Sequence, residues 1–174
     1  YFDFTVVKQL GAYLIEDNLG IEGSDTVMDV ERVEFVDGTL AFDTDGNAGQ
    51  TYRLYQAAFE RIPDSSGVNY HVNDIEGNGL VLHQIAGNFL ASPEFEQTYG
   101  ENLSDSSYVD ALYENVLGRA PADSEKQYYL ERFTKPASDS MWMDHAAALI
   151  GFSESPENIT LVAPQIENGI WLGS

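Results

Sequence analysis

The chain carries one long motif twice. Each residue in the first half of the motif returns 58 positions later, and the pairs are Leu54 and Leu112, Tyr55 and Tyr113, Phe59 and Leu117, Arg61 and Arg119, Pro63 and Pro121, and Tyr70 and Tyr128. The second half, Ser92-Pro93-Glu94, returns after 63 positions as Ser155-Pro156-Glu157. The second copy therefore holds five extra residues, near 134–140. A period this long indicates a duplicated supersecondary unit, which serves packing and presentation.

Both copies have the residue spacing of amphipathic helices. In the second copy, apolar side chains fill one helical stripe at Val109, Leu112, Tyr113, Val116 and Leu117. We expect four residues to be buried together in one core: Leu54, Phe59, Leu112 and Leu117.

Prolines and capping residues predict where these helices begin and end. We expect Pro63 and Pro121 to end the first helix of each copy, because proline lacks the backbone N–H that a helix needs. The next helix is expected to be capped by Asp64 in the first copy and by Asp123 in the second. Each Ser-Pro-Glu segment is expected to start the last helix of its copy, with the serine as the cap.

The first 46 residues have a different pattern. Apolar and polar residues alternate around Phe4 and again around Val33, and Asp37-Gly38 is typical of a hairpin turn. The sequence therefore predicts a mainly α fold with a short N-terminal β-hairpin-like segment. We assign residues 1–46 to the β-rich segment and 47–174 to the duplicated helical domain, with units at about 50–100 and 108–163.

Charge and composition restrict the partners of the chain. Its formal net charge is −21, with 29 acidic residues against 8 basic ones. Nucleic acids and anionic lipids bind through Lys and Arg, so we expect no nucleic-acid partner. No apolar run approaches the roughly 20 residues of a membrane span, so no membrane insertion is expected. The absence of Cys excludes disulfides, thiolate metal sites and a Cys nucleophile.

Two segments are candidates for calcium binding. Residues 20–27 form a degenerate glycine- and aspartate-rich calcium nonapeptide, in which Asp25 is the candidate ligand and a simple turn is the alternative. Asp43, Asp45 and Asn47 place oxygen atoms at alternate positions, like the first half of an EF-hand loop. Ala48 and Leu54 stand where that loop needs Gly and a bidentate carboxylate. The loop therefore fails as an EF-hand. A calcium ion held with backbone and water ligands is one interpretation, and a linker whose Asp and Asn cap the following helix is the competing one.

Other polar and aromatic residues indicate no catalytic centre. His71, His83 and His145 lack metal-ligand spacing, and none stands beside an evident nucleophile. Arg61 and Tyr70 are the candidate ligand-binding pair, although a duplicated Arg also suits a structural role at a helix end. Aromatic residues that prove to be exposed would favour a sugar-stacking platform.

Several segments resemble known families. The segments Gly23-Ser24-Asp25-Thr26-Val27 and Asp37-Gly38-Thr39-Leu40-Ala41-Phe42-Asp43 resemble the region that follows haemolysin-type calcium repeats. Tyr52-Arg53-Leu54-Tyr55 and Gly151-Phe152-Ser153-Glu154-Ser155-Pro156-Glu157-Asn158 resemble a bacterial domain of unknown function, numbered four-two-one-four. Its repeat is similar to that of phycobilisome linker polypeptides. The second copy departs from the family pattern at Ala122, Lys126 and Tyr129.

The resemblance implies a setting for this chain. The family occurs in large proteins that are exported by type I secretion, commonly near their C-termini, and it brings no established catalytic residues. We therefore expect a non-catalytic module of a secreted or cell-surface protein that mediates attachment, adhesion or assembly. A glycan or a surface protein is the expected partner, and calcium is the expected cofactor. Two alternatives remain open: a carbohydrate-binding module, and an export-signal region or spacer without a ligand.

Overall fold

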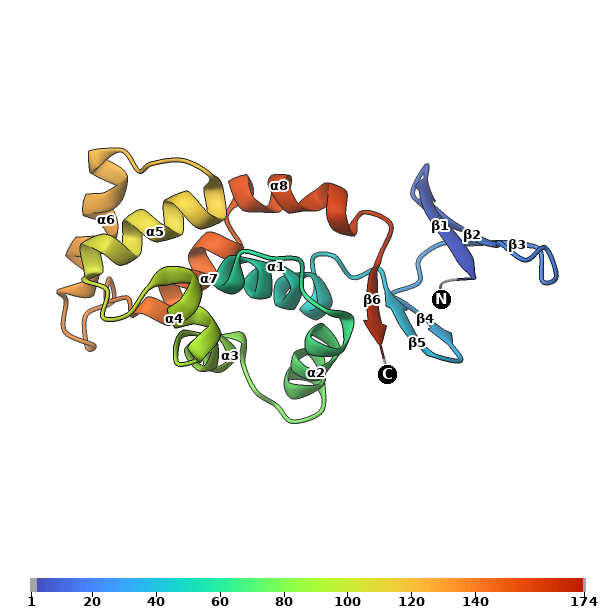
Figure 1. Ribbon diagram of the computed structural model, residues 1–174, viewed down its shortest axis with the longest axis horizontal. Coiled ribbons are helices and arrows are strands. Elements are labelled where there is room, and N and C mark those ends of the chain that lie inside the picture. The colour runs from blue at the N-terminus through green and yellow to red at the C-terminus, as the bar shows by residue number, and fades with distance from the viewer. Residues whose placement is uncertain (1–2, 174) are drawn as a thin grey trace.

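Helices fill the middle of the chain, and strands lie near both of its ends (Figure 1). The computed structural model describes residues 3–173. The helices in this range are α1 (Asn47–Phe59), α2 (Ser65–Glu76), α3 (Leu82–Leu90), α4 (Pro93–Tyr99), α5 (Asp105–Leu117), α6 (Asp123–Phe133), α7 (His145–Ser153) and α8 (Pro156–Ile166). The predicted mainly α fold with a short N-terminal β segment is confirmed.

The helix bounds reproduce the sequence repeat. Helices α1 and α5 begin and end 58 positions apart, and α2 and α6 begin 58 positions apart. The starts of α3 and α7, and those of α4 and α8, are separated by 63 positions. The longer connection of the second copy therefore lies between α6 and α7, which is where the extra residues were expected. Each copy consists of four helices in the same order.

Most of the predicted helix caps are confirmed. The side chains of Ser92 and Ser155 accept hydrogen bonds from backbone N–H groups at the starts of α4 and α8, and Asp64 does the same at α2. The prediction for Asp123 is wrong, because it is the first residue of α6 rather than its cap. At this helix the Glu125 carboxylate accepts instead from the N–H of Ala122, at 2.8 Å.

The first helix of each copy ends before its proline. Helix α1 stops at Phe59 and α5 stops at Leu117, so Pro63 and Pro121 do not terminate them directly. The chain leaves both helices through a left-handed residue, Glu60 at φ 51° and Gly118 at φ 66°. This conformation ends a helix by turning the next N–H groups back onto its last carbonyls.

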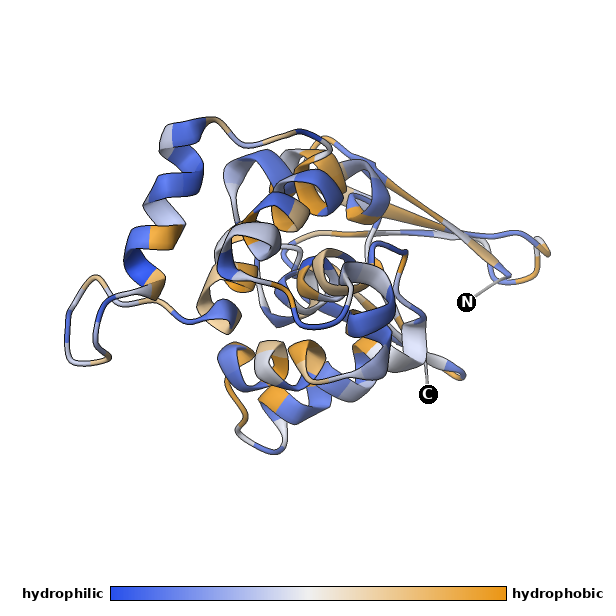
Figure 2. Cartoon of the chain, turned by 60° about the vertical axis from the view of Figure 1, so that its left-hand side comes forward, coloured by the Kyte–Doolittle hydropathy of each residue, from blue (hydrophilic) through white to orange (hydrophobic). Residues whose placement is uncertain are grey.

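One hydrophobic core joins the two copies. Leu54, Phe59 and Leu112 are buried in it, and Leu117 is partly buried against it. Helix α1 contacts α2, α3, α4, α5, α7 and α8, while α7 contacts α1, α3, α5 and α8. Figure 2 shows that hydrophobic residues concentrate where these helices face one another, whereas α6 is largely hydrophilic. None of the helices within residues 3–173 has the length and apolar character needed to cross a lipid bilayer.

Two antiparallel sheets cover one end of the helices (Figure 1). The first contains β1 (Phe4–Gln9), β2 (Ala12–Asp17) and β3 (Ser24–Val27), in that order. The second contains β4 (Arg32–Phe35), β5 (Gly38–Ala41) and β6 (Ile170–Gly173). Strand β6, which the sequence did not predict, pairs Ile170 with Ala41 and so joins residues after α8 to the β-rich segment.

A buried arginine connects the β-rich segment with both helical copies. Arg53 on α1 is 2% exposed; its guanidinium donates to the carboxylate of Glu154 at 2.6 and 2.8 Å and to the backbone oxygen of Thr44 at 2.6 Å. Gly49 permits the close approach of α1 to this loop, since a Cβ atom there would lie 1.7 Å from the Thr44 oxygen. Removing only one partner of such a buried pair is costly, because the other charge stays buried.

Candidate functional site

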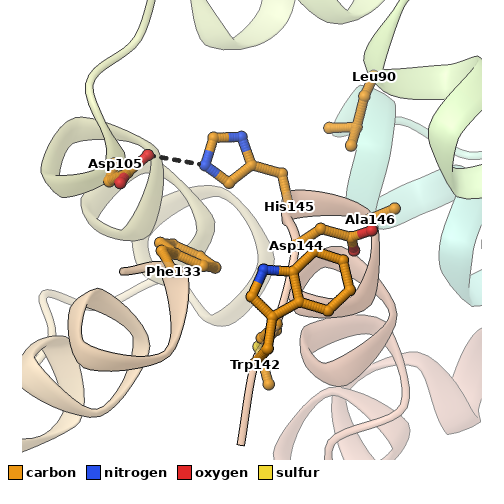
Figure 3. A pocket seen from close by; sticks show the side chains of 8 residues that line it. Leu90, Asp105, Phe133, Trp142, Asp144, His145 and Ala146 are labelled. Atoms are coloured by element: carbon orange, nitrogen blue, oxygen red, sulfur yellow. Dashed lines mark hydrogen bonds and ion pairs between the residues drawn. The ribbon is translucent and has the colours of Figure 1, made fainter. Parts of the chain in front are cut away.

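A pocket of about 430 Å³ opens beside the second copy, at the place where its extra residues lie. Its wall contains Asp105 from the start of α5, Phe133 from the end of α6, and Trp142, Asp144 and His145 from the connection into α7. Figure 3 shows these side chains around one opening, with the Trp142 indole beside Asp144 and below His145. Trp142 is 41% exposed, so part of its ring surface is available to a ligand.

His145 is held in place from three sides. Its Nε2 atom lies 2.9 Å from Oδ1 of Asp105, and its ring packs against those of Tyr108 and Phe133 at centroid distances of 4.4 and 4.9 Å. The buried Tyr108 hydroxyl also donates to the backbone oxygen of His145, at 2.9 Å. Burial raises the pKa of Tyr108, so this hydroxyl stays protonated as a donor. The imidazole is therefore a fixed polar group beside an aromatic surface.

Asp144 forms a second polar pair at the same pocket. Its carboxylate caps α7 by accepting from the N–H of Ala147 at 2.8 Å, and it lies 2.9 Å from Nε2 of His83. Burial disfavours its charged form, but the hydrogen bonds from Ala147 and His83 outweigh this effect and lower the pKa of Asp144. The neighbours Asp144 and His145 face different partners, as expected for adjacent positions at a helix start.

The polar and aromatic side chains of the pocket come from the second copy, whereas Leu90 of α3 adds an apolar contact from the first copy. At the repeat offsets of 58 and 63, the counterparts of Asp105, Phe133, Trp142, Asp144 and His145 are Asn47, Ile75, Gly79, Val81 and Leu82. The shared scaffold therefore does not require the polar and aromatic groups of the pocket. The sequence analysis did not identify this site, although the divergence between the copies was the signal that marked it.

The chemistry of the pocket suits binding. The side chains that line it include no hydroxyl or thiol, so the pair of His145 and Asp105 has no such group to activate as in a Ser-His or Cys-His pair. The wall does combine an exposed indole with fixed carboxylate and imidazole groups. Such a surface offers stacking to an apolar ring face and hydrogen bonds to neighbouring hydroxyls.

The predicted EF-hand-like loop is organised by an arginine. Arg32 of β4 donates to both carboxylate oxygens of Asp43, at 2.9 and 3.0 Å, and to Glu76 at 2.9 Å. Asp43 also accepts from the N–H of Ala48 in the first turn of α1, at 3.2 Å, and the Asn47 amide donates to Glu76. The carboxylate of Asp43 is thus engaged by a guanidinium, and the loop in this arrangement does not fit a calcium ion.

Asp25, Asp43, Asp45 and Asn47 do not converge on one point. Asp25 lies exposed on β3, where it pairs across the sheet with Ile15, and Asp45 is exposed before α1. Within residues 3–173, no group of three or more His, Asp or Glu side chains is arranged to hold a metal ion. The glycine-rich turn that precedes β3 is instead closed by Asp17. Its carboxylate accepts from three backbone N–H groups at 2.6 to 2.8 Å, and these bonds lower its pKa.

Arg61 and Tyr70, the candidate ligand-binding pair, have separate surroundings. The Arg61 guanidinium lies over the Tyr55 ring, 5.1 Å from its centroid, and pairs with Glu94 at 2.6 Å. Tyr70 is 65% exposed on α2, and its ring meets the His71 ring edge to face. The assignment of a ligand to this pair stays a prediction, and Arg61 has internal partners.

The contacts of Arg61 recur in the second copy. There the Arg119 guanidinium lies 4.9 Å from the centre of the Tyr113 ring and pairs with Glu157 at 2.8 Å and with Glu125 at 2.9 Å. We call each set of Tyr, Arg and Glu a latch: Tyr55, Arg61 and Glu94 in the first copy, and Tyr113, Arg119 and Glu157 in the second. Each latch ties the end of the first helix of a copy to the start of its last helix. The repeated arginines thus have a structural use.

Comparison with known proteins identifies part of the chain. Residues 86–162 match the model of the Domain of unknown function (DUF4214) family, and this match covers a little under half of the chain. It runs from α3 of the first copy through α7 and most of α8 of the second, and it includes every pocket residue described above. No curated protein matches the chain.

Proposed function

We propose that this chain is a non-catalytic attachment module of an exported protein, and that it acts outside the cell or at its surface. The match of residues 86–162 to the DUF4214 family supports the assignment of the helical domain. The resemblance of the β-rich segment to the region after haemolysin-type calcium repeats supports the exported setting. A strongly acidic, cysteine-free surface is compatible with that setting.

One observation supports attachment more than any other. The charged residues that repeat between the copies are used in the latches, whereas the polar and aromatic groups that do not repeat surround an open pocket. A scaffold that holds a variable surface on a duplicated core is suited to presentation. The pocket lacks a hydroxyl or thiol nucleophile, which supports binding over acyl transfer of the Ser-His or Cys-His type.

Localisation tests the exported setting. An antibody raised against this chain is applied to intact cells of the source organism, to permeabilised cells and to the culture medium. We expect signal on intact cells or in the medium, with a cytoplasmic protein as the control for leakage. Signal that appears only after permeabilisation would contradict the proposal.

A carbohydrate-binding module is the second candidate, and Trp142 favours it. Pyranose rings present an apolar face of C–H groups that stacks on indole, while their hydroxyls bind carboxylates and imidazoles. Asp105, Asp144 and His145 supply such groups around the exposed ring. This candidate gives attachment a defined ligand class.

A glycan array tests this candidate. The labelled chain is compared with Trp142→Ala and with Met141→Ala, a control that removes an exposed side chain from the same connection. We expect micromolar or weaker binding that falls by at least about tenfold in Trp142→Ala, the equivalent of 1.4 kcal/mol, and little change in the control. Equal binding by Trp142→Ala and Met141→Ala would show that the pocket is not the glycan-binding site. The absence of binding to any glycan would favour a protein ligand, or the export-signal and spacer alternative.

Calcium remains a proposed cofactor, with a defined test. A ligand that binds only the folded state raises the melting temperature by mass action. Because Arg32 already neutralises Asp43, we expect at most a small change between chelator and millimolar calcium. A large increase in the melting temperature on adding calcium would show that the β-rich segment binds calcium in an arrangement that differs from the pairing of Arg32 with Asp43.

A further inference from the structure

A second hollow adjoins the pocket at Trp142. It has a volume of about 180 Å³ and lies where α4 leads into α5, at the junction of the two copies. Leu90 and His145 line both hollows, and Figure 3 shows these two side chains at the wall of the first. The imidazole of His145 contacts one ring of each hollow, Phe133 at a centroid distance of 4.9 Å and Tyr108 at 4.4 Å. The two hollows are therefore neighbours on one surface.

The second hollow combines apolar and polar groups. The buried Phe95 and the partly buried Leu103 form part of its wall, and Glu96 and Asn102 line it from exposed positions. The loop between α4 and α5 is shaped by two residues with positive φ, Gly100 at 99° and Asn102 at 54°. The side-chain amide of Asn102 supplies both donors and an acceptor for hydrogen bonds. The second hollow thus offers the same kinds of contact as the pocket beside it.

The formally charged residues that line the two hollows are all acidic. Asp105 and Asp144 line the pocket at Trp142, and Glu96 lines the second hollow. Neither Lys nor Arg is among the described residues that line either hollow. A ligand that brings a carboxylate would meet like charges there, with no guanidinium or ammonium group to pair with, and such repulsion is a means of rejecting a ligand.

We propose that the two hollows form one groove that binds an oligosaccharide of at least two residues, made of neutral or amino sugars. One ring stacks on Trp142, and the next lies past His145 in the second hollow, where Asn102 and Glu96 bind its hydroxyls. The repeating rings and hydroxyls of a glycan match two adjoining hollows that each combine apolar and polar groups. The inference rests on the carbohydrate-binding candidate of the proposed function, and it specifies the length and charge of the ligand.

Ligand length tests the groove. Mono-, di- and trisaccharides of glucose, galactose and mannose are printed on one array, and those that bind are titrated by calorimetry. We expect at least one disaccharide to bind the wild-type chain about tenfold or more tightly than its monosaccharide, because it fills both hollows. Equal affinities would overturn the groove and leave the carbohydrate-binding candidate in place. The absence of binding to every saccharide would overturn both.

Substitution of Asn102 locates the second sugar. Asn102→Gly removes the side chain and keeps the left-handed backbone, which glycine adopts readily. Leu10→Gly is the matched control, because Leu10 is exposed at φ 50° far from the groove and its loss also leaves the net charge unchanged. We expect Asn102→Gly to lose at least about threefold in disaccharide affinity and nothing in monosaccharide affinity, as for one lost hydrogen bond. An unchanged disaccharide affinity in this variant, with a wild-type melting temperature, would contradict the second site.

Ligand charge tests the class of sugar. The disaccharide that binds best is compared with its amino and uronic acid forms. We expect the uronic form to bind at least about tenfold more weakly than the neutral form, and the amino form to bind no more weakly. Glu96→Gln should narrow this discrimination more than Glu101→Gln, which makes the same change in charge at an exposed position outside the hollow. Equal binding of neutral and uronic forms, or equal narrowing in both variants, would contradict the proposal.

Discussion

In each copy, one tyrosine ring holds several elements together. In the first copy, Tyr55 packs edge to face on Phe89 at 5.2 Å, while Arg61 lies over its ring. In the second, Tyr113 packs in the same way on Phe152 at 4.7 Å. Edge-to-face rings and cation–π contacts each contribute on the order of 1 kcal/mol. The duplicated Tyr and Arg therefore act in packing, where a ligand site would leave them free.

The left-handed residues after α1 and α5 give a stability prediction. Glu60 at φ 51° occupies the position that Gly118 occupies in the second copy. A residue with a Cβ atom costs about 1 kcal/mol more than glycine in this conformation. We expect Glu60→Gly to stabilise the protein by up to about 1 kcal/mol and Gly118→Ala to destabilise it by a similar amount.

Urea denaturation measures both changes. Gly151→Ala is the matched control, because this helical glycine has free space at its Cβ position and no positive φ. We expect that variant to be neutral or slightly stabilising. A lower stability for Glu60→Gly would show that the Glu60 side chain contributes more than its backbone strain costs.

Glu125, the second carboxylate partner of Arg119, gives a pH prediction. The hydrogen bond from Arg119 is the main reason that the pKa of Glu125 falls from 4.5 to about 2. A lowered pKa in the folded state means that the unfolded state takes up the proton first as the pH falls. The stabilisation is therefore present above about pH 4.5 and is lost as the pH falls toward about 2.

Glu125→Gln should remove this part of the acid sensitivity. Thermal melts between pH 2 and 7 are expected to show a shallower loss of stability for Glu125→Gln than for the wild type. Glu114→Gln, at an exposed position of α5, serves as the control and should follow the wild-type curve. Identical pH profiles for all three proteins would mean that the pair of Arg119 and Glu125 adds no stability.

At the scale of elements, the two copies differ in what covers their second helix. Helix α2 buries Val68 and Val72 in a cluster with β6. Its counterpart α6 has no fully buried residue and lies at the far end of the molecule (Figure 1). Weakly anchored elements open at a lower free energy than core elements. The connection that carries Trp142 follows this helix, so the pocket stands on the less anchored part of the fold.

The shared core of α1 and α5 makes a quantitative prediction. Leu112 is fully buried, whereas its neighbour Leu117 is only partly buried. We expect Leu112→Ala to lower the free energy of unfolding by about 2–5 kcal/mol, as a cavity in a packed core does, and Leu117→Ala to cost clearly less. Urea denaturation measures both, and an equal cost for the two variants would contradict the described packing.

The helices were predictable from local sequence patterns. Features that depend on contacts between distant segments were not. The repeat offsets and the Ser-Pro-Glu starts depend on a few adjacent residues, so they were readable from the sequence. Strand β6 exists because β5 lies beside it, and a run of four residues carries too little pattern to predict it. Asp123 failed as a cap because α6 begins at Asp123 itself, so the cap position falls on Ala122.

The candidate site was predictable only in part, for the same reason. The spacing of Asp43, Asp45 and Asn47 gave no indication that Arg32 would reach the loop from β4. The pocket gathers residues from the starts of α5 and α7 and the end of α6, which are brought together only by the tertiary fold. Comparing the two copies position by position was the route by which the sequence alone could have identified it.

At the scale of the whole molecule, the two sheets and the second helix of the second copy lie at opposite ends. The sheets lie at one end and α6 at the other, with the shared helical core between them (Figure 1). The pocket is lined in part by Phe133 at the end of α6. The net charge of −21 makes copies of the chain repel one another and attracts cations.

Binding and turnover measured together test the central claim, that the chain attaches to a ligand without transforming it. Immobilised glycans, peptides and esters are incubated with the chain in calcium-containing buffer, and both retained protein and released fragments are quantified. We expect retention on at least one ligand that depends on Trp142, with every ligand recovered intact. Released fragments that disappear in a folded His145→Ala or Asp105→Asn variant would contradict the account.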